Sequence, residues 1–203
     1  ADPGRLRELL IPGVGVRLVP VDASASGRST SFDLVLVEHH GILVSIDSRV
    51  PNKLIGAALR AGAFPELCAS DCGGGRLVRP EYTWGSSRFD FRLSAEGQPD
   101  TLVEVKSASL VVNGVAMFPD APTERGARHM RELAEATRQG MGAAVVFVIQ
   151  RSDAESFTPN AVMDPPFADA VRAAADAGVA VKAVRCDVRE HSINIVGEVE
   201  ARV

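Results

Sequence analysis

The segment RFDFRLSAEGQPDTLVEVKSASL, residues 88–110, carries the side chains with the clearest chemical use. It is predicted to form two strands joined by a polar loop, with Asp90 in the first strand and Glu104 and Lys106 in the second. Side chains alternate along a strand, so Glu104 and Lys106 share one face. Asp90 can meet them there if the two strands pair. By the same alternation, Phe89, Phe91 and Leu93 are predicted to share the face opposite to Asp90.

This group has the composition of a metal-dependent hydrolytic centre. Two carboxylates and the carbonyl of Val105 are hard oxygen ligands, which suit Mg²⁺ or Mn²⁺. Hydrolysis of a phosphodiester needs a metal to activate water and to stabilise the charge of the transition state. Lys106 can orient the attacking water, and Glu81 on the preceding strand can add a carboxylate. We therefore predict Asp90, Glu104 and Lys106 as catalytic residues, and Asp90, Glu104, Val105 and Glu81 as metal ligands.

The same residues also have a purely structural interpretation. Glu104 and Lys106 can form a weak ion pair on an exposed strand face. Asp90 can be neutralised by Arg88 and Arg92. The spacing of these residues is compatible with both interpretations.

The first fifty residues are predicted to be all β. Strands are expected at 14–19, 31–38 and 42–46, where Val, Ile and Leu are frequent, with a tight turn at 39–41. The sequence then changes character, which places a boundary near residue 50. We predict a short β domain over 1–50 and an α/β domain over 51–203.

The second part alternates helical and strand patterns. Asn52 is predicted to cap a helix that ends at Gly62, and strands are expected at 77–84, 88–93 and 102–112. A long helix should begin at Thr123 and end at Gly140, and another should run from Asp164 to Gly178. The apolar run AAVVFVI is typical of a strand covered on both faces. Two strands close the chain.

Composition narrows the class of protein. The net charge of −4 and the pI of about 5.6 argue against a generally basic nucleic-acid binder, although a local patch can still be basic. Three cysteines without a framework spacing favour a reducing, cytoplasmic setting. Cys68 and Cys72 lack the second Cys/His pair that a zinc site needs. No apolar run approaches the ~20 residues that span a bilayer, so no membrane association is expected.

Six ordered segments resemble a known family. DPGRLRELLIPG, SIDSRVPNKLIGAALRAG, SRFDFRL, VEVKSASL, MFPDAPTERGARHMREL and FVIQRSD are similar to signature segments of the sugar fermentation stimulation protein A family. The resemblance implies an N-terminal OB-fold domain followed by a PD-(D/E)xK nuclease-like domain, with a mixed sheet and flanking helices. Family members carry further residues before the first segment, so either the barrel is incomplete here or its opening strands lie outside this sequence.

The resemblance also bears on function. It implies DNA binding and a role in regulating sugar-utilisation genes, and its motif falls on Asp90, Glu104 and Lys106. We therefore expect a DNA-binding protein with a divalent-metal-dependent nuclease centre. One alternative is a non-catalytic DNA-binding regulator that retains the nuclease fold. Another is a centre that binds a small phosphorylated or sugar ligand. The sequence leaves the oligomeric state open, and a homo-oligomer is compatible with it.

Four further polar residues are candidates for contact with phosphate or DNA. Arg125 and Arg128 can hold a phosphate, and His129 on the same helix can assist proton transfer. Gln150, at the end of the apolar strand, can position a water or a phosphate. The structural alternatives are that the helix residues only solvate its surface and that Gln150 only ends its strand.

Overall fold

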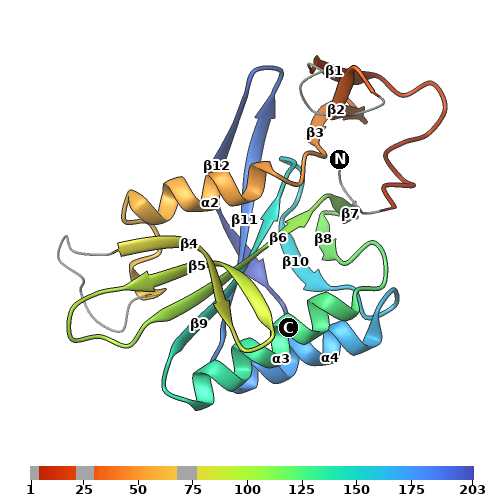
Figure 1. The fold of residues 1–203 in the computed structure, drawn as a ribbon. Coiled ribbons are helices and arrows are strands. Elements are labelled where there is room, and N and C mark those ends of the chain that lie inside the picture. The colour runs from red at the N-terminus through yellow and green to blue at the C-terminus, as the bar shows by residue number, and fades with distance from the viewer. Residues whose placement is uncertain (1–4, 22–29, 68–76) are drawn as a thin grey trace.

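The computed structural model describes residues 5–21, 30–67 and 77–203 (Figure 1). Cys68 and Cys72 lie outside the described residues. The elements in chain order are β1 (Val16–Pro20), β2 (Phe32–His39), β3 (Ile42–Ser45), α2 (Val50–Arg60), the 3-10 turn η1 (Pro65–Leu67), β4 (Leu77–Trp84), β5 (Ser87–Ser94), β6 (Thr101–Ala108), β7 (Leu110–Val112), β8 (Val115–Phe118), α3 (Glu124–Arg138), β9 (Gly142–Ile149), β10 (Ser156–Pro159), α4 (Pro165–Asp176), β11 (Ala180–Arg189) and β12 (Ser192–Ala201).

These strands form two sheets. The first is antiparallel, with the order β1-β2-β3, and the second is mixed, with the order β4-β5-β6-β9-β11-β12-β10-β8-β7. The predicted mixed α/β class is confirmed. Within the described residues the N-terminal sheet stays open and does not close into a barrel.

The ends of the helices follow from capping side chains. The hydroxyl of Thr123 accepts a hydrogen bond from the amide of Gly126, and a carboxylate oxygen of Asp164 accepts one from Phe167, each at 3.0 Å. Such side chains satisfy amides that have no partner inside the helix. The predicted starts of α3 and α4 are therefore confirmed.

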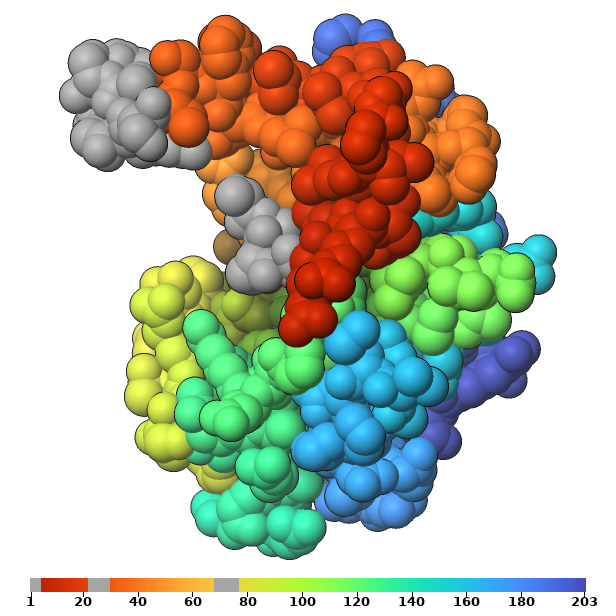
Figure 2. All heavy atoms as spheres, turned by 90° about the vertical axis from the view of Figure 1, so that its right-hand side faces the viewer, coloured from red at the N-terminus to blue at the C-terminus, as the bar shows by residue number. Residues whose placement is uncertain are grey.

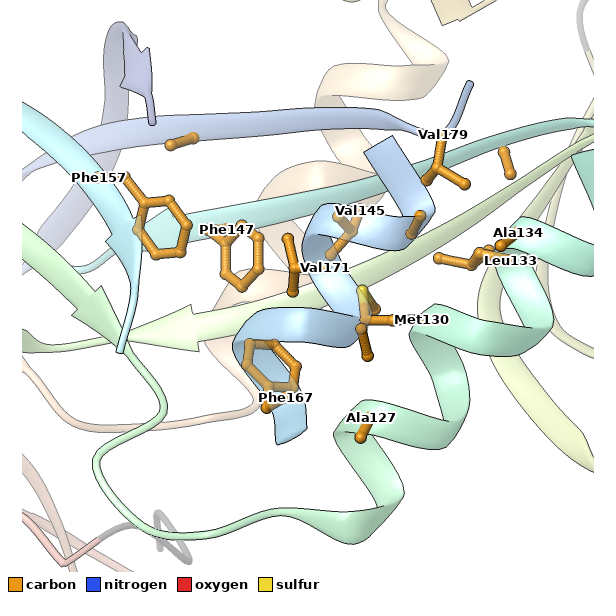
Figure 3. Packing of buried hydrophobic residues seen from close by; sticks show 14 of the residues in the cluster. Ala127, Met130, Leu133, Ala134, Val145, Phe147, Phe157, Phe167, Val171 and Val179 are labelled. Atoms are coloured by element: carbon orange, nitrogen blue, oxygen red, sulfur yellow. The ribbon is translucent and has the colours of Figure 1, made fainter. Parts of the chain in front are cut away.

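Strand β9 lies inside the large sheet, between β6 and β11, and is buried on both faces, as its apolar run predicted. Val145 and Phe147 alternate with Val146 and Val148, and the two sets belong to different core clusters. Helices α3 and α4 cover the first face, and α2 covers the second (Figure 1). Figure 3 shows how α3 and α4 pack on the first face. Its labelled side chains include Met130 and Leu133 from α3 and Phe167 and Val171 from α4.

The single strand predicted over 102–112 is wrong. The chain forms β6 up to Ala108 and then, after Ser109, β7, and these two strands lie far apart in the order of the sheet. The separation follows from pairing, since β6 runs beside β9 whereas β7 pairs only with β8. The short strands β8 and β10 were not predicted at all.

The N-terminal sheet is docked on the large sheet. The amide of Ser45 donates to the carbonyl of Gln150 at 3.0 Å, and Leu36 belongs to the core cluster that contains Val188. In the space-filling view a hollow lies between the orange N-terminal part and the yellow-green segment that contains β4 and β5 (Figure 2). Since the two sheets share a core cluster, the domain boundary at residue 50 stays a prediction.

Among the described residues, no helix combines the length and the apolar character that crossing a bilayer requires.

Candidate active site

The carboxylate of Glu104 is the centre of the site. Strand β6 lies between β5 and β9, and its Glu104 side chain, which contacts His129 of α3, is only 5% exposed. One of its oxygens, Oε1, lies 2.5 Å from Nζ of Lys106 and 2.5 Å from Nδ1 of His129. The other oxygen, Oε2, is buried and has no hydrogen-bond partner in the described part of the chain. A buried charged oxygen without a partner is costly in a folded protein.

Helix α3 brings His129 to this carboxylate. His129 is 1% exposed, and its second ring nitrogen, Nε2, accepts a hydrogen bond from Nε of Arg125 at 3.3 Å. A guanidinium only donates, so Nε2 must be unprotonated in this contact. The ring proton is therefore assigned to Nδ1, which donates it to Glu104.

The electrostatics of the site favour an ionised Glu104. Burial alone would raise the pKa of this carboxyl group. The hydrogen bond from His129 and the positive charge of Lys106 outweigh burial, and the net pKa lies below the ordinary value. Glu104 is therefore a carboxylate at neutral pH.

Asp90 stands where β5 and β6 separate. Their pairing begins at Leu93 opposite Thr101 and reaches only to Phe91 opposite Val103. Beyond that point, the amide of Val105 donates to Oδ2 of Asp90 at 2.7 Å. The aspartate carboxylate thus accepts a hydrogen bond from an amide of β6 at a point where the pairing of β6 with the β5 backbone has ended.

Asp90 is harder to ionise than Glu104. Burial and the negative charge of Glu104 raise the pKa of Asp90, and hydrogen bonds from Val105 and Asn52 offset part of that rise. The ammonium group of Lys106 also lowers it. The site therefore contains two carboxyl groups with pKa values shifted in opposite directions, as is common in functional centres.

The predicted alternation along β5 is wrong at one position. Phe89 packs in the α3-side core, where its ring lies 5.6 Å from that of His129. Phe91 packs on the other face of the sheet, against Gly56 of α2. The change of face coincides with a break in the β4–β5 ladder opposite Asp90, where Glu81 has a φ of 53° and does not pair.

Asn52 belongs to the site, and its predicted role as a helix cap is wrong. Helix α2 begins at Val50 without a side-chain cap, so Asn52 lies inside its first turn. Its amide nitrogen donates to Oδ1 of Asp90 at 2.6 Å. Polar residues at helix starts usually cap them, and no sequence signal connects positions 52 and 90.

Replacing Asn52 by alanine should raise the pKa of Asp90 further, because the lost hydrogen bond stabilises its charged form. Titration of the Asp90 carboxyl by NMR in the metal-free protein measures this shift directly. Binding of Mn²⁺ should then require a higher pH, since protons compete with the metal for carboxylates. Asn194→Ala, on exposed β12, is the matched control. An unchanged Asp90 titration would contradict the assigned role.

The geometry does not match a weak surface ion pair or neutralisation of Asp90 by its strand neighbours. Glu104 and Lys106 do pair, but their side chains are 5% and 14% exposed, so this is no weak surface contact. Arg92 lies 2.5 Å from the carboxylate of Asp100, and Arg88 pairs with Glu81 at 3.5 Å. Asp90 is therefore not neutralised by its strand neighbours.

The remaining candidates are spread around this centre. Arg125 is connected to the Glu104 carboxylate through its hydrogen bond to His129. Glu81 lines the same groove as Asp90, but its side chain is 69% exposed. Arg128 is exposed and faces a different groove, between the starts of α3 and α4.

Gln150 is fully buried. Its side-chain oxygen accepts a hydrogen bond from the hydroxyl of Ser45, and its side-chain nitrogen donates one to the hydroxyl of Ser107. Gln150 therefore connects the two sheets, and its predicted contact with a phosphate stays a prediction.

The side chains of this centre provide only some of the ligands that a hard divalent cation needs. No group of three or more His, Cys, Asp or Glu side chains among the described residues is arranged to hold a metal. The centre instead offers the buried, unpartnered oxygen of Glu104 and the carboxylate of Asp90, next to the peptide between Glu104 and Lys106. Magnesium is commonly held by one or two carboxylates together with water and phosphate oxygens, which fits this set.

Comparison with known proteins gives consistent matches. Residues 49–192 match the family model described as the sugar fermentation stimulation protein RE domain, and residues 1–46 match the SfsA N-terminal OB domain. A sugar fermentation stimulation protein homolog of Moorella thermoacetica is 48% identical over 204 residues, covering 100% of this chain and 85% of the relative. A homolog of Chloroflexus aurantiacus is 45% identical, over 98% of this chain and 74% of the relative.

A solved structure is also similar. It is described as the structure of Pyrococcus furiosus SfsA in complex with Ca²⁺. The likeness has a TM-score of 0.87 at 30% sequence identity and covers 100% of this chain and 84% of the other. It confirms the predicted fold class, in which a small N-terminal β unit precedes a nuclease-like mixed sheet.

Proposed function

Because the chain belongs to the sugar fermentation stimulation protein family, we propose that it is a DNA-binding protein whose buried centre hydrolyses phosphodiester bonds with a divalent metal. Asp90, Glu104 and Lys106 are the proposed catalytic residues. Mg²⁺ or Mn²⁺ is the proposed ion, held by Asp90, Glu104 and the carbonyl of Val105.

The observation that carries this proposal is the state of the Glu104 carboxylate. One oxygen is held by Lys106 and His129, and the other is buried without a partner. A residue retained only for stability would be expected to satisfy both oxygens. A bound cation would satisfy the second one. The similar Pyrococcus furiosus protein was solved with Ca²⁺, which is also a hard cation with oxygen ligands.

The proposed mechanism assigns a separate task to each side chain. A bound divalent ion would polarise the phosphate and acidify its bound water. Glu104 contributes negative charge and is held in a fixed orientation by His129. Lys106 is placed beside Glu104, where its ammonium group can orient the attacking water and stabilise charge on the phosphate. Arg125 orients His129 and is placed to contact the phosphate from the α3 side.

Burial adds to the effect of these charges. Glu104, Lys106 and His129 are largely shielded from solvent, and electrostatic interactions are stronger where water is excluded. The site is therefore suited to stabilising charge that develops during the reaction.

The test is cleavage of single- and double-stranded DNA by the unmodified protein with Mg²⁺ or Mn²⁺, against a parallel reaction in EDTA. Cutting that depends on the metal is the expected result. DNA that is retained on a gel but never cut would contradict the hydrolytic role and favour the regulator that keeps the fold without catalysis.

A further inference from the structure

Two cations on α2 stand beside the centre without partners. Lys53 and Arg60 are exposed, and neither forms an ion pair or a side-chain hydrogen bond with any residue in the described part of the chain. Other cations, such as Arg49, Arg92 and Arg172, are paired with carboxylates and so have part of their charge neutralised within the protein. Unpaired positive charge in an acidic protein suggests attraction for an anionic partner.

Both residues line the groove that leads to Asp90. Its walls are formed by Asn52, Lys53 and Arg60 of α2 and by Pro80, Glu81 and Asp90 of the β4–β5 hairpin. The acidic wall residue Glu81 is balanced by Arg88 at 3.5 Å. The net local charge along the α2 wall is therefore positive.

The position of Arg60 is built into the packing of α2. A Cβ atom at Gly56 would lie 3.3 Å from a terminal nitrogen of Arg60 and 3.0 Å from the ring of Phe91. The absence of a side chain at Gly56 thus lets the guanidinium lie back along the helix toward its start, where Asn52 and Asp90 meet. Long side chains on helices generally lean in this direction.

The spacing of the two cations suits a phosphate backbone. Seven residues along a helix correspond to about 10 Å, which is about three phosphates along one DNA strand at about 3.4 Å of axis each. We propose that this groove receives the sugar-phosphate backbone of the nucleic acid on one side of the centre, with Lys53 and Arg60 contacting phosphates. The inference rests on the proposed function and adds the path by which the substrate approaches Asp90.

The experiment measures DNA binding in EDTA, so that cleavage cannot interfere. A fluorescein-labelled DNA oligonucleotide, single-stranded or annealed, is titrated with the native protein and with Lys53→Gln/Arg60→Gln while the salt concentration is varied. The double variant should bind on the order of 50-fold more weakly at about 0.1 M salt. The slope of log affinity against log salt should fall by about 2.

The matched control is Arg138→Gln/Arg172→Gln, which removes the same charge from exposed sites on α3 and α4. Its affinity and salt slope should stay close to those of the native protein. If the native protein binds and both double variants bind equally well, the inference is overturned and the proposed function stands. If the native protein binds neither probe, the DNA partner of the proposed function and this inference both fall.

Discussion

Replacing Glu104 by glutamine is expected to abolish metal-dependent DNA cleavage, with a loss of about 10³-fold or more in rate. The amide keeps the size of the side chain and can still accept hydrogen bonds from Lys106 and His129. It removes the negative charge that would hold the cation at the buried Oε2 position. The measurements are the cleavage rate with Mn²⁺ and the affinity for Mn²⁺ itself.

The same substitution separates catalysis from DNA binding. A carboxylate repels phosphate, so Glu104→Gln should not weaken DNA affinity in EDTA. Glu135→Gln, on an exposed part of α3, is the matched control and should cut like the native protein. A Glu104→Gln variant that cuts within about tenfold of the native rate would remove Glu104 from the mechanism.

Removing the carboxylate of Asp153 should strongly destabilise the protein. Arg151 is 2% exposed, and its guanidinium makes two hydrogen bonds to Asp153, at 2.6 and 2.7 Å, and one to the carbonyl of Ser109 at 3.0 Å. Asp153→Ala leaves this buried cation without its counterion. We expect a loss of about 3 kcal/mol in the free energy of unfolding, at the low end for buried pairs because Asp153 itself is 41% exposed.

The loss should appear as a fall of about 6–12 °C in the melting temperature. Asp169→Ala is the matched control, because Asp169 forms a similar contact with Arg172, at 2.9 Å, between side chains that are 75% and 56% exposed. That control should change stability by less than about 1 kcal/mol. Equal losses of stability in the two variants would show that the burial of Arg151 does not increase the contribution of its ion pair to stability.

The pH dependence gives a second check on this pair. Burial would raise the pKa of Asp153, but the hydrogen bond and charge of Arg151 outweigh it and lower the pKa below the ordinary value. A carboxyl group with a depressed pKa stabilises the fold above its unfolded pKa, about 3.9, and loses that contribution as the pH falls through the folded value. The difference in stability between the native protein and Asp153→Ala should therefore shrink below about pH 4.

Local patterns in the sequence determined much of this protein. The spacing of Glu104 and Lys106 placed both on one face of a strand, and the structure confirms that they meet. The caps at Thr123 and Asp164 set the starts of two helices, and the apolar run in β9 predicted a strand buried on both faces. Each of these features depends on interactions within a few residues, which a single sequence displays.

Tertiary structure decided the rest of the site. The contacts of His129 with Glu104 and of Asn52 with Asp90 join residues 25 and 38 positions apart. Local spacing is compatible with many such pairings, and the packing of α2 and α3 on opposite faces of the sheet selects these. The break in the β4–β5 ladder at Glu81, next to the point where Phe89 and Phe91 face different core clusters, likewise depends on how neighbouring strands pair. Alternation therefore predicted the chemistry along one strand, whereas the surroundings of each charge were decided only when distant segments packed together.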